Sequence, residues 1–189
     1  LTDAATYTPT YTPTPAETGD VVLSLSANGL STCSAVSDQV TIHILPMVTA
    51  DAGPDKSVCQ NSTFTVTSAS SLNFKTLLWT TSGTGILSGE TTINPSYVPG
   101  AGETGPVTFT LTAAGNPPCG NVVDDFILTV NPPVTANAGL PDVICETGTF
   151  ALSASSTTNE VSWLWTTSGA GSFDNATILH PTYTPLGAD

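Results

Sequence analysis

The sequence predicts an all-β fold made of tandem β-sandwich repeats with a period of 86 residues. Three observations carry this prediction: a motif that returns at a constant spacing, apolar residues that alternate with polar ones, and turn residues at regular intervals. The motif is the hexapeptide LWTTSG, which occupies residues 78–83 and again residues 164–169. A fixed period of this length is typical of repeat architectures.

An offset of 86 residues aligns the chain with itself without a gap. Residues 50–135 then form one complete unit, residues 1–49 align with its second half, and residues 136–189 align with its first half. A half sandwich would expose the core that it should bury, so we expect the natural chain to continue in both directions. The residues that coincide at this offset include Cys59 with Cys145, Trp79 with Trp165, Tyr97 with Tyr183, Tyr11 with Tyr97, Cys33 with Cys119, and Asp38 with Asp124.

The charge balance restricts the partners of the chain. Its 189 residues include 15 acids and only two basic residues, Lys56 and Lys75, which gives a formal charge of −13. Nucleic acids and anionic membrane surfaces are recognised by Lys and Arg, so the sequence excludes both as partners. No apolar run approaches the roughly 18 residues of a membrane span, and we expect no membrane insertion of this segment.

Apolar residues alternate with Thr and Ser at the period of half-buried strands. Val107, Phe109 and Leu111, for example, are separated by threonines. Turn sequences such as SGTG and PGAGETG divide each unit into about seven strands, the number typical of an immunoglobulin-like sandwich. Trp79 is expected to lie in the core. We predict strands near residues 62–70, 75–82, 106–114 and 123–131.

The four cysteines suggest a disulfide framework. Cys59 ends the first strand of the complete unit, and Cys119 precedes the last strand. If the first and last strands lie side by side in parallel, the two positions are expected at one end of the sandwich, and we predict a Cys59–Cys119 bridge. Cys33 and Cys145 would then have partners outside this chain. Such a bridge would contribute about 4 kcal/mol and would indicate an extracellular location.

Three further motifs carry a resemblance to a known family. They are the opening A-[DN]-A-G followed by a cysteine, the centre W-x-x-[ST]-G, and the segment N-P-x-Y-x-P. Together they resemble the tandem PKD-like and immunoglobulin-like repeats of long Bacteroidetes cell-surface proteins, particularly the gliding-motility adhesins. The second copy departs from the pattern, because Pro141 stands where Asp55 is expected and His180 stands where Asn94 is expected.

The resemblance implies a secreted stalk or adhesin on the surface of a Gram-negative cell. It also implies export by the type IX secretion system and display on the outer membrane. Its partners would be the neighbouring repeats of the same chain, other cell-surface proteins, or surface polysaccharide.

The search for chemistry finds one candidate site and no catalytic constellation. Neither His43 nor His180 has a second histidine or a nucleophile motif beside it in the sequence, and we expect no enzyme. The acidic residues Asp51, Asp55 and Glu103 lie near the junctions between units, where carboxylates and loop carbonyls could bind calcium. The alternative is solvated surface charge. We therefore take calcium at the junctions as a hypothesis, with these three residues as its ligands.

Two functions remain open. The first is a structural one, in which the chain is a section of an extended, disulfide-stapled shaft that serves adhesion or gliding motility. Proline-containing junctions such as LPMVTADAGPD favour it, because prolines keep linkers extended. The second is a carbohydrate-binding or other ligand-binding β-sandwich module, which would need several aromatic side chains exposed together.

Overall fold

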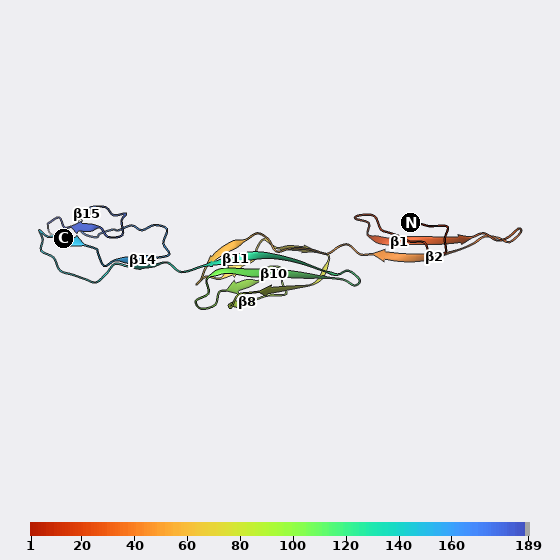
Figure 1. The fold of residues 1–189 in the computed structure, drawn as a ribbon, viewed down its shortest axis with the longest axis horizontal. Coiled ribbons are helices and arrows are strands. Elements are labelled where there is room, and N and C mark those ends of the chain that lie inside the picture. The colour runs from red at the N-terminus through yellow and green to blue at the C-terminus, as the bar shows by residue number, and fades with distance from the viewer. Residues whose placement is uncertain (188–189) are drawn as a thin grey trace.

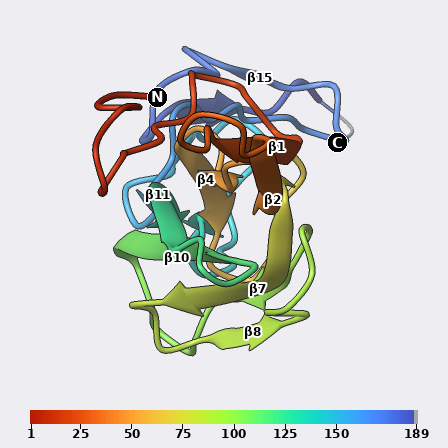
Figure 2. The same ribbon diagram turned by 90° about the vertical axis from the view of Figure 1, so that its right-hand side faces the viewer.

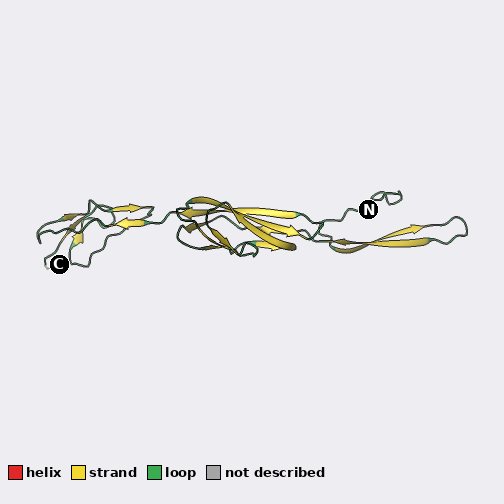
Figure 3. Cartoon of the chain, turned by 90° about the horizontal axis from the view of Figure 1, so that it is seen from below, coloured by secondary structure: helices red, strands yellow, loops and turns green. Residues whose placement is uncertain are grey.

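A computed structural model of the chain describes residues 1–187 and shows an all-β protein. Strands and connecting loops make up this part of the chain (Figure 3). Three groups of strands follow one another along the long axis (Figure 1), and in the view along that axis they lie one behind another (Figure 2). The described residues contain no helix that is long and apolar enough to cross a membrane.

The first group is a β-hairpin. Strand β1 (Gly19–Ala27) pairs with strand β2 (Val36–Ile44) in an antiparallel register that runs from Gly19 opposite Ile44 to Ala27 opposite Val36. No other strand of the described chain pairs with this hairpin. Its apolar side chains therefore remain largely accessible to solvent, and Leu25 is 73 % exposed.

The middle group contains a sheet in the order β4-β11-β10-β7. The long strands β10 (Gly105–Gly115) and β11 (Asn121–Asn131) form a hairpin at its centre. Strand β7 (Phe74–Thr81) pairs with β10 in the antiparallel direction, and strand β4 (Lys56–Cys59) pairs with β11 in the parallel direction. The first and last strands of this sheet order are thus separated by the hairpin.

Shorter strands cover the other side of the core. Strand β9 (Ser96–Val98) lies between β5 (Phe64–Thr65) and β8 (Ile86–Ser88), and β3 (Thr49–Asp51) pairs with β6 (Ser70–Leu72). These sheets face β10 and β11 across an aromatic cluster, which is the arrangement of a β-sandwich.

The core of this sandwich follows from the alternation of residues along β10 and β11. Every second residue of β10 points inward and is buried, whereas the threonines between them lie on the outer face. The ring of Phe109 stacks on Phe126 at 5.1 Å and meets Tyr97 edge-on at 5.0 Å. Trp79 is 1 % exposed, so its predicted burial is confirmed, and its Nε1 donates a hydrogen bond of 3.1 Å to the Thr92 carbonyl. Each buried aromatic ring contributes about 2–3 kcal/mol to this core.

The last group repeats only part of this pattern. Strand β12 (Thr135–Asn137) pairs with β14 (Ser156–Thr158), and β16 (Thr182–Thr184) lies between β13 (Phe150–Ala151) and β15 (Ser172–Phe173). No strand of the described residues follows β16, so nothing equivalent to the β10–β11 hairpin lies over these sheets.

Three of the four predicted strands of the middle unit agree with the structure. The predictions for residues 75–82, 106–114 and 123–131 correspond to β7, β10 and β11. The prediction for residues 62–70 is wrong, because only Phe64–Thr65 and Ser70 onward belong to strands. Between them the chain leaves the sheet that contains β5 and enters the sheet that contains β6.

Candidate functional site

The best-defined polar site of the middle sandwich is centred on the carboxylate of Glu103. Its Oε2 accepts hydrogen bonds from the Tyr97 hydroxyl at 2.6 Å and from the Gly100 amide at 2.8 Å. Its Oε1 accepts a hydrogen bond of 2.6 Å from the Thr84 amide. The Gly85 amide in turn donates to the Tyr97 oxygen at 2.9 Å. The network ties the loop that precedes β10 to the turn that follows β7.

The turn after β7 contains glycine for a steric reason. A Cβ atom on Gly85 would lie 2.2 Å from the carbonyl oxygen of Val98 and 2.7 Å from the hydroxyl of Tyr97. The chain can therefore approach Tyr97 only where a side chain is absent. The glycines of TSGTG thus leave room for the side chain of Tyr97.

The pKa values of the pair reflect this packing. Burial and the hydrogen bond to Glu103 raise the pKa of the Tyr97 hydroxyl to about 12. Partial burial opposes the ionisation of Glu103, but the hydrogen bonds from Tyr97, Thr84 and Gly100 outweigh it and lower the pKa of this carboxyl below its usual value. Both shifts favour a neutral phenol that donates to an ionised carboxylate at neutral pH.

The same contact occurs near the N-terminus. The Tyr11 hydroxyl donates to Oε1 of Glu17, and the Thr14 amide donates to Oε2 of Glu17 at 2.8 Å. The spacing of six residues between tyrosine and glutamate is the same in both places. This repeated spacing is the sequence signal that could have identified the pair. The corresponding position Asp189 lies outside the described residues.

The three residues proposed to bind calcium do not come together. Glu103 lies near the C-terminal end of β11, because β10 begins two residues after it at Gly105, opposite Val130, and its carboxylate accepts the hydrogen bond from the Tyr97 hydroxyl. Asp51 accepts a hydrogen bond of 2.9 Å from the Gly53 amide, and Asp55 accepts one of 2.8 Å from the Ile127 amide in β11. The structure therefore does not gather the three proposed ligands in one place, and the described residues contain no group of three His, Cys, Asp or Glu that could hold a metal. Calcium at the junctions stays a hypothesis.

The acidic residues instead fasten the segment before β4 to β11. Asp124 in β11 accepts a hydrogen bond of 2.7 Å from the Ala52 amide, 72 residues earlier in the chain. The contact between Asp55 and Ile127 spans 72 residues as well. In each contact a carboxylate accepts the hydrogen bond of a backbone amide, as a carbonyl oxygen does between paired strands. The two contacts therefore hold the residues just before β4 against β11.

The predicted disulfide between Cys59 and Cys119 is also wrong. All four cysteines lie within the described residues and are free thiols. Cys59 pairs with Asn131 at the end of β11, whereas Cys119 lies two residues before β11 begins. A strand of this length separates them by roughly 35 Å, and a disulfide needs Cα atoms within roughly 7 Å. The prediction that the first and last strands are parallel neighbours is correct for β4 and β11. In a parallel pair, however, the end of β4 at Cys59 lies beside the end of β11, whereas Cys119 lies before its start.

The histidines have structural contacts. His43 Nδ1 lies 2.5 Å from Asp20 Oδ1 on the exposed face of the β1–β2 hairpin. His180 Nδ1 lies 3.1 Å from the hydroxyl of Ser155. This buried hydroxyl lies within hydrogen-bond distance of the carbonyl oxygens of Leu152 and Leu179, at 2.8 and 2.7 Å, and its one hydrogen can be donated to either of them. Ser155 thereby holds two loops of the last group together.

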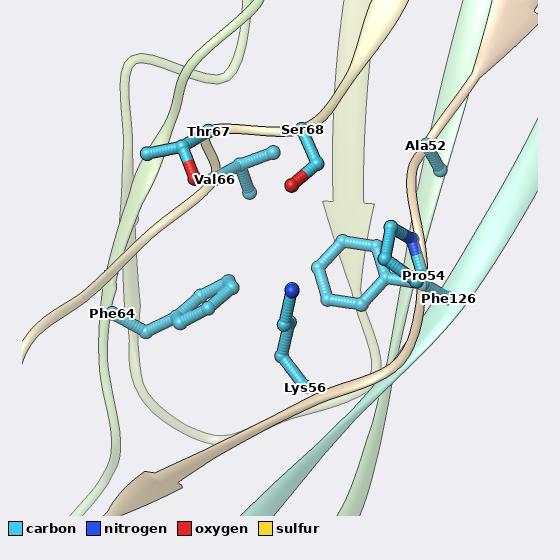
Figure 4. A pocket seen from close by; sticks show the side chains of 8 residues that line it. All are labelled: Ala52, Pro54, Lys56, Phe64, Val66, Thr67, Ser68 and Phe126. Atoms are coloured by element: carbon cyan, nitrogen blue, oxygen red, sulfur yellow. The ribbon is translucent and has the colours of Figure 1, made fainter.

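The small pocket of the middle sandwich is too small for a substrate. It lies between Phe64 and Phe126, and Figure 4 shows the Lys56 amine pointing into it. Its volume of about 20 Å³ accommodates about one water molecule. Neither the comparison with protein-family models nor the search of the curated proteins finds a match to this chain.

Proposed function

We propose that the chain is a section of a long extracellular adhesin or filament, in which immunoglobulin-like or PKD-like sandwiches of 86 residues follow one another as a stalk. In this proposal the segments 1–49, 50–135 and 136–189 are a second half, a complete unit and a first half. The chain acts mechanically in adhesion or gliding motility and has no catalytic role.

The recurrence of strand pairing carries the proposal. Gly19 pairs with Ile44 in β1–β2. The two residues that lie 86 positions later, Gly105 and Val130, pair in the same way in β10–β11. Side-chain contacts recur at the same offset, since Asn73 Nδ2 donates to the Met47 carbonyl and Asn159 Nδ2 donates to the Pro133 carbonyl. The other pairs that recur are Thr49–Leu72 with Thr135–Thr158, and Phe64–Tyr97 with Phe150–Tyr183.

The topology of the middle unit supports an immunoglobulin-like assignment. In that fold a central strand with a buried tryptophan lies in one sheet with the last two strands. Here β7 carries Trp79 and lies beside the β10–β11 hairpin. The parallel contact of β4 with β11 places an early strand next to the last one.

The junctions support a stalk that resists bending. Only residues 45–48 separate β2 from β3, and only residues 132–134 separate β11 from β12. The first junction is held to the middle unit, because Val48 is buried in its core and Asn73 Nδ2 binds the Met47 carbonyl at 2.7 Å. Short linkers with proline restrict the relative motion of the units.

The proposed location and partners rest on the resemblance and the composition. Because the four cysteines are free thiols in the described chain, disulfides no longer support the extracellular location. Export by the type IX system, display on the outer membrane and contact with neighbouring repeats belong to the same proposal. The alternative, a carbohydrate-binding module, has less support, since four aromatic side chains of the complete unit (Trp79, Tyr97, Phe109 and Phe126) are buried in its core, Phe64 packs against them, and Phe74 is its one exposed aromatic residue.

Small-angle X-ray scattering together with a glycan array tests the two functions. A stalk predicts a rod-like scattering profile with little bending between units and no specific sugar binding. A profile of freely moving units would overturn the stalk, and saturable binding of one glycan class would favour the module. The scattering is measured at low protein concentration, so that contacts between copies do not add to the apparent length.

A further inference from the structure

The four-stranded sheet of the middle unit has two open edges. In the order β4-β11-β10-β7 the outer strands are β4 and β7, and no strand of the described chain pairs with their outer sides. These two strands contain four and eight residues, whereas the other edge strands of the unit, β3, β5, β6 and β8, contain only two or three. A longer open edge can pair with a strand of another chain, because its outer backbone groups have no partner strand.

The backbone of β7 shows how much of its edge is covered. The Trp79 amide donates a hydrogen bond of 2.7 Å to the Glu90 carbonyl, which lies in a loop outside the sheet, so this amide points away from β10. Backbone groups two positions apart along a strand point the same way, and those of Leu77 therefore face the outer edge as well. Within the described residues, no loop backbone group is bonded to β7 before Trp79. Glu90 thus covers one position and leaves the first half of the strand open.

The two lysines of the chain lie on these two edges. Lys56 is the first residue of β4 and Lys75 is the second residue of β7, and the sequence contains no other Lys or Arg. The two strands supply 12 of the 189 residues, four from β4 and eight from β7, so chance alone would seldom place one lysine on each. Lysine on an edge strand is a common means of preventing the edge from pairing with another chain.

Lys56 occupies an inward position of its strand. It is paired with Leu128, which is 0 % exposed, and residues paired across neighbouring strands lie on the same face of a sheet. Figure 4 accordingly shows the Lys56 amine between Phe64 and Phe126 on the core side of β4. The lysine is nevertheless exposed, because the edge beside it is open. A strand added to β4 would cover the amine.

Lys75 repeats this arrangement on the opposite edge. It lies two positions before Leu77, which is buried on the inward face of β7, and is itself exposed. Neither lysine forms an ion pair in the part of the chain that the structure describes, and the residues around the Lys56 amine include no carboxylate. Solvent therefore stabilises both ammonium groups. An added strand would displace that solvent and leave a charge uncompensated, at a cost that corresponds to at least about a tenfold change in a dissociation constant.

We propose that Lys56 and Lys75 keep the two edges of the middle sheet from pairing with strands of other chains. A strand that approached β4 or β7 would have to enclose the ammonium group beside it. The remaining edge strands of the unit need no such residue, because two or three residues offer too few hydrogen bonds to hold an added strand. The proposal goes beyond the stalk function and does not depend on it, since a β-sandwich in any role has to avoid edge pairing.

Removal of the lysines tests the proposal, because edge protection and net charge predict opposite results. Lys56→Val combined with Lys75→Val removes two positive charges and changes the formal charge from −13 to −15, so repulsion between copies alone would weaken their association. We expect the reverse, with the full 189-residue double variant associating at least about tenfold more tightly than the parent chain. Sedimentation velocity over a dilution series measures the difference. Valine suits a strand, and Val161 already stands 86 residues after Lys75.

Two control variants separate the charge at the edge from other effects. Lys56→Glu combined with Lys75→Glu keeps a charge on each edge, although of opposite sign, and should associate no more tightly than the parent chain. Thr80→Val adds an apolar side chain to the exposed outward face of β7 and leaves both lysines in place, so it should also behave like the parent. Hydrogen–deuterium exchange locates the contact, because the amides of β4 and β7 in the double valine variant should become protected as its concentration rises.

Three results would overturn the proposal. They are association of the double valine variant that is equal to or weaker than that of the parent, tighter association without added protection of β4 or β7, and a glutamate variant that associates as tightly as the valine variant. Circular dichroism verifies that each variant is folded. The single variants Lys56→Val and Lys75→Val each expose one edge and should show part of the effect, so they decide the question if the double variant does not fold.

Discussion

The hydroxyl of Tyr97 and the carboxylate of Glu103 share a hydrogen bond of 2.6 Å at one end of the middle sandwich. Tyr97 is fully buried, while Glu103 is only partly so. The bond thus links the core to a surface loop. Because the Thr84 and Gly100 amides bind the same carboxylate, loss of either side chain leaves several groups without partners.

We expect Tyr97→Phe to lower the free energy of unfolding of the middle unit by about 1–3 kcal/mol, because the Gly85 amide loses its acceptor and Glu103 loses a donor. Urea unfolding followed by circular dichroism measures the change. The matched control is Tyr11→Phe, which removes the corresponding bond to Glu17 at a partly exposed site. An equal loss in both variants would show that burial of Tyr97 does not strengthen the contact.

The pKa shifts predict two limits to the pH range of stability. The folded-state pKa of Glu103 is lowered, so its contribution is present above the usual carboxyl pKa and is lost as the pH falls through the folded value. The folded-state pKa of Tyr97 is raised from 10.0 to about 12, so its contribution is present below pH 10.0 and is lost as the pH rises to about 12.

The contribution of Glu103 is measured by comparing the free energy of unfolding of the parent chain with that of Glu103→Gln, at acidic and at neutral pH. The difference between the two proteins should shrink at acidic pH. The contribution of Tyr97 is measured in the same way with Tyr97→Phe. As the pH rises above 10.0, the free energy of unfolding of this variant should fall less than that of the parent chain. Parallel pH profiles of parent and variant would contradict the proposed role of the pair.

The Asp124 carboxylate should contribute to stability through the Ala52 amide and not through a metal. We expect Asp124→Ala to reduce the free energy of unfolding by about 1.5–3 kcal/mol, the range for hydrogen bonds to charged groups. The control Asp125→Ala changes the neighbouring, exposed acid. Adding calcium or a chelator should leave the melting temperature of the parent chain unchanged. A shift of several degrees with calcium would support the metal hypothesis.

The thiols should be reactive and independent of one another. We expect alkylation under native conditions to modify Cys33, Cys59 and Cys145 rapidly and Cys119 more slowly, because Cys119 is the only one of the four described cysteines that is partly buried. Reductant should not change the melting temperature. Mass spectrometry of the oxidised, alkylated monomer would overturn this if it found a Cys59–Cys119 bridge.

The strand content and the core of the middle unit could be predicted from the sequence by itself. Alternation of apolar residues with threonines reports directly which face of a strand is buried, because successive side chains point to opposite faces. This local rule correctly identified β7, β10 and β11 and the burial of Trp79. The period of 86 residues stays a prediction, and the hairpins β1–β2 and β10–β11 are the two segments on which its further test can concentrate.

Only the tertiary structure decided which distant residues meet. Cys59 and Cys119 seemed to lie at one end of the sandwich, but the pairing of Cys59 with Asn131 places them at opposite ends of β11. Asp51, Asp55 and Glu103 looked like one acidic site, yet each carboxylate binds backbone amides in a different place. The physical reason is that periodicity fixes the side on which a residue lies, whereas strand direction, register and the path of the loops fix its neighbours, and these depend on contacts between segments far apart in the chain.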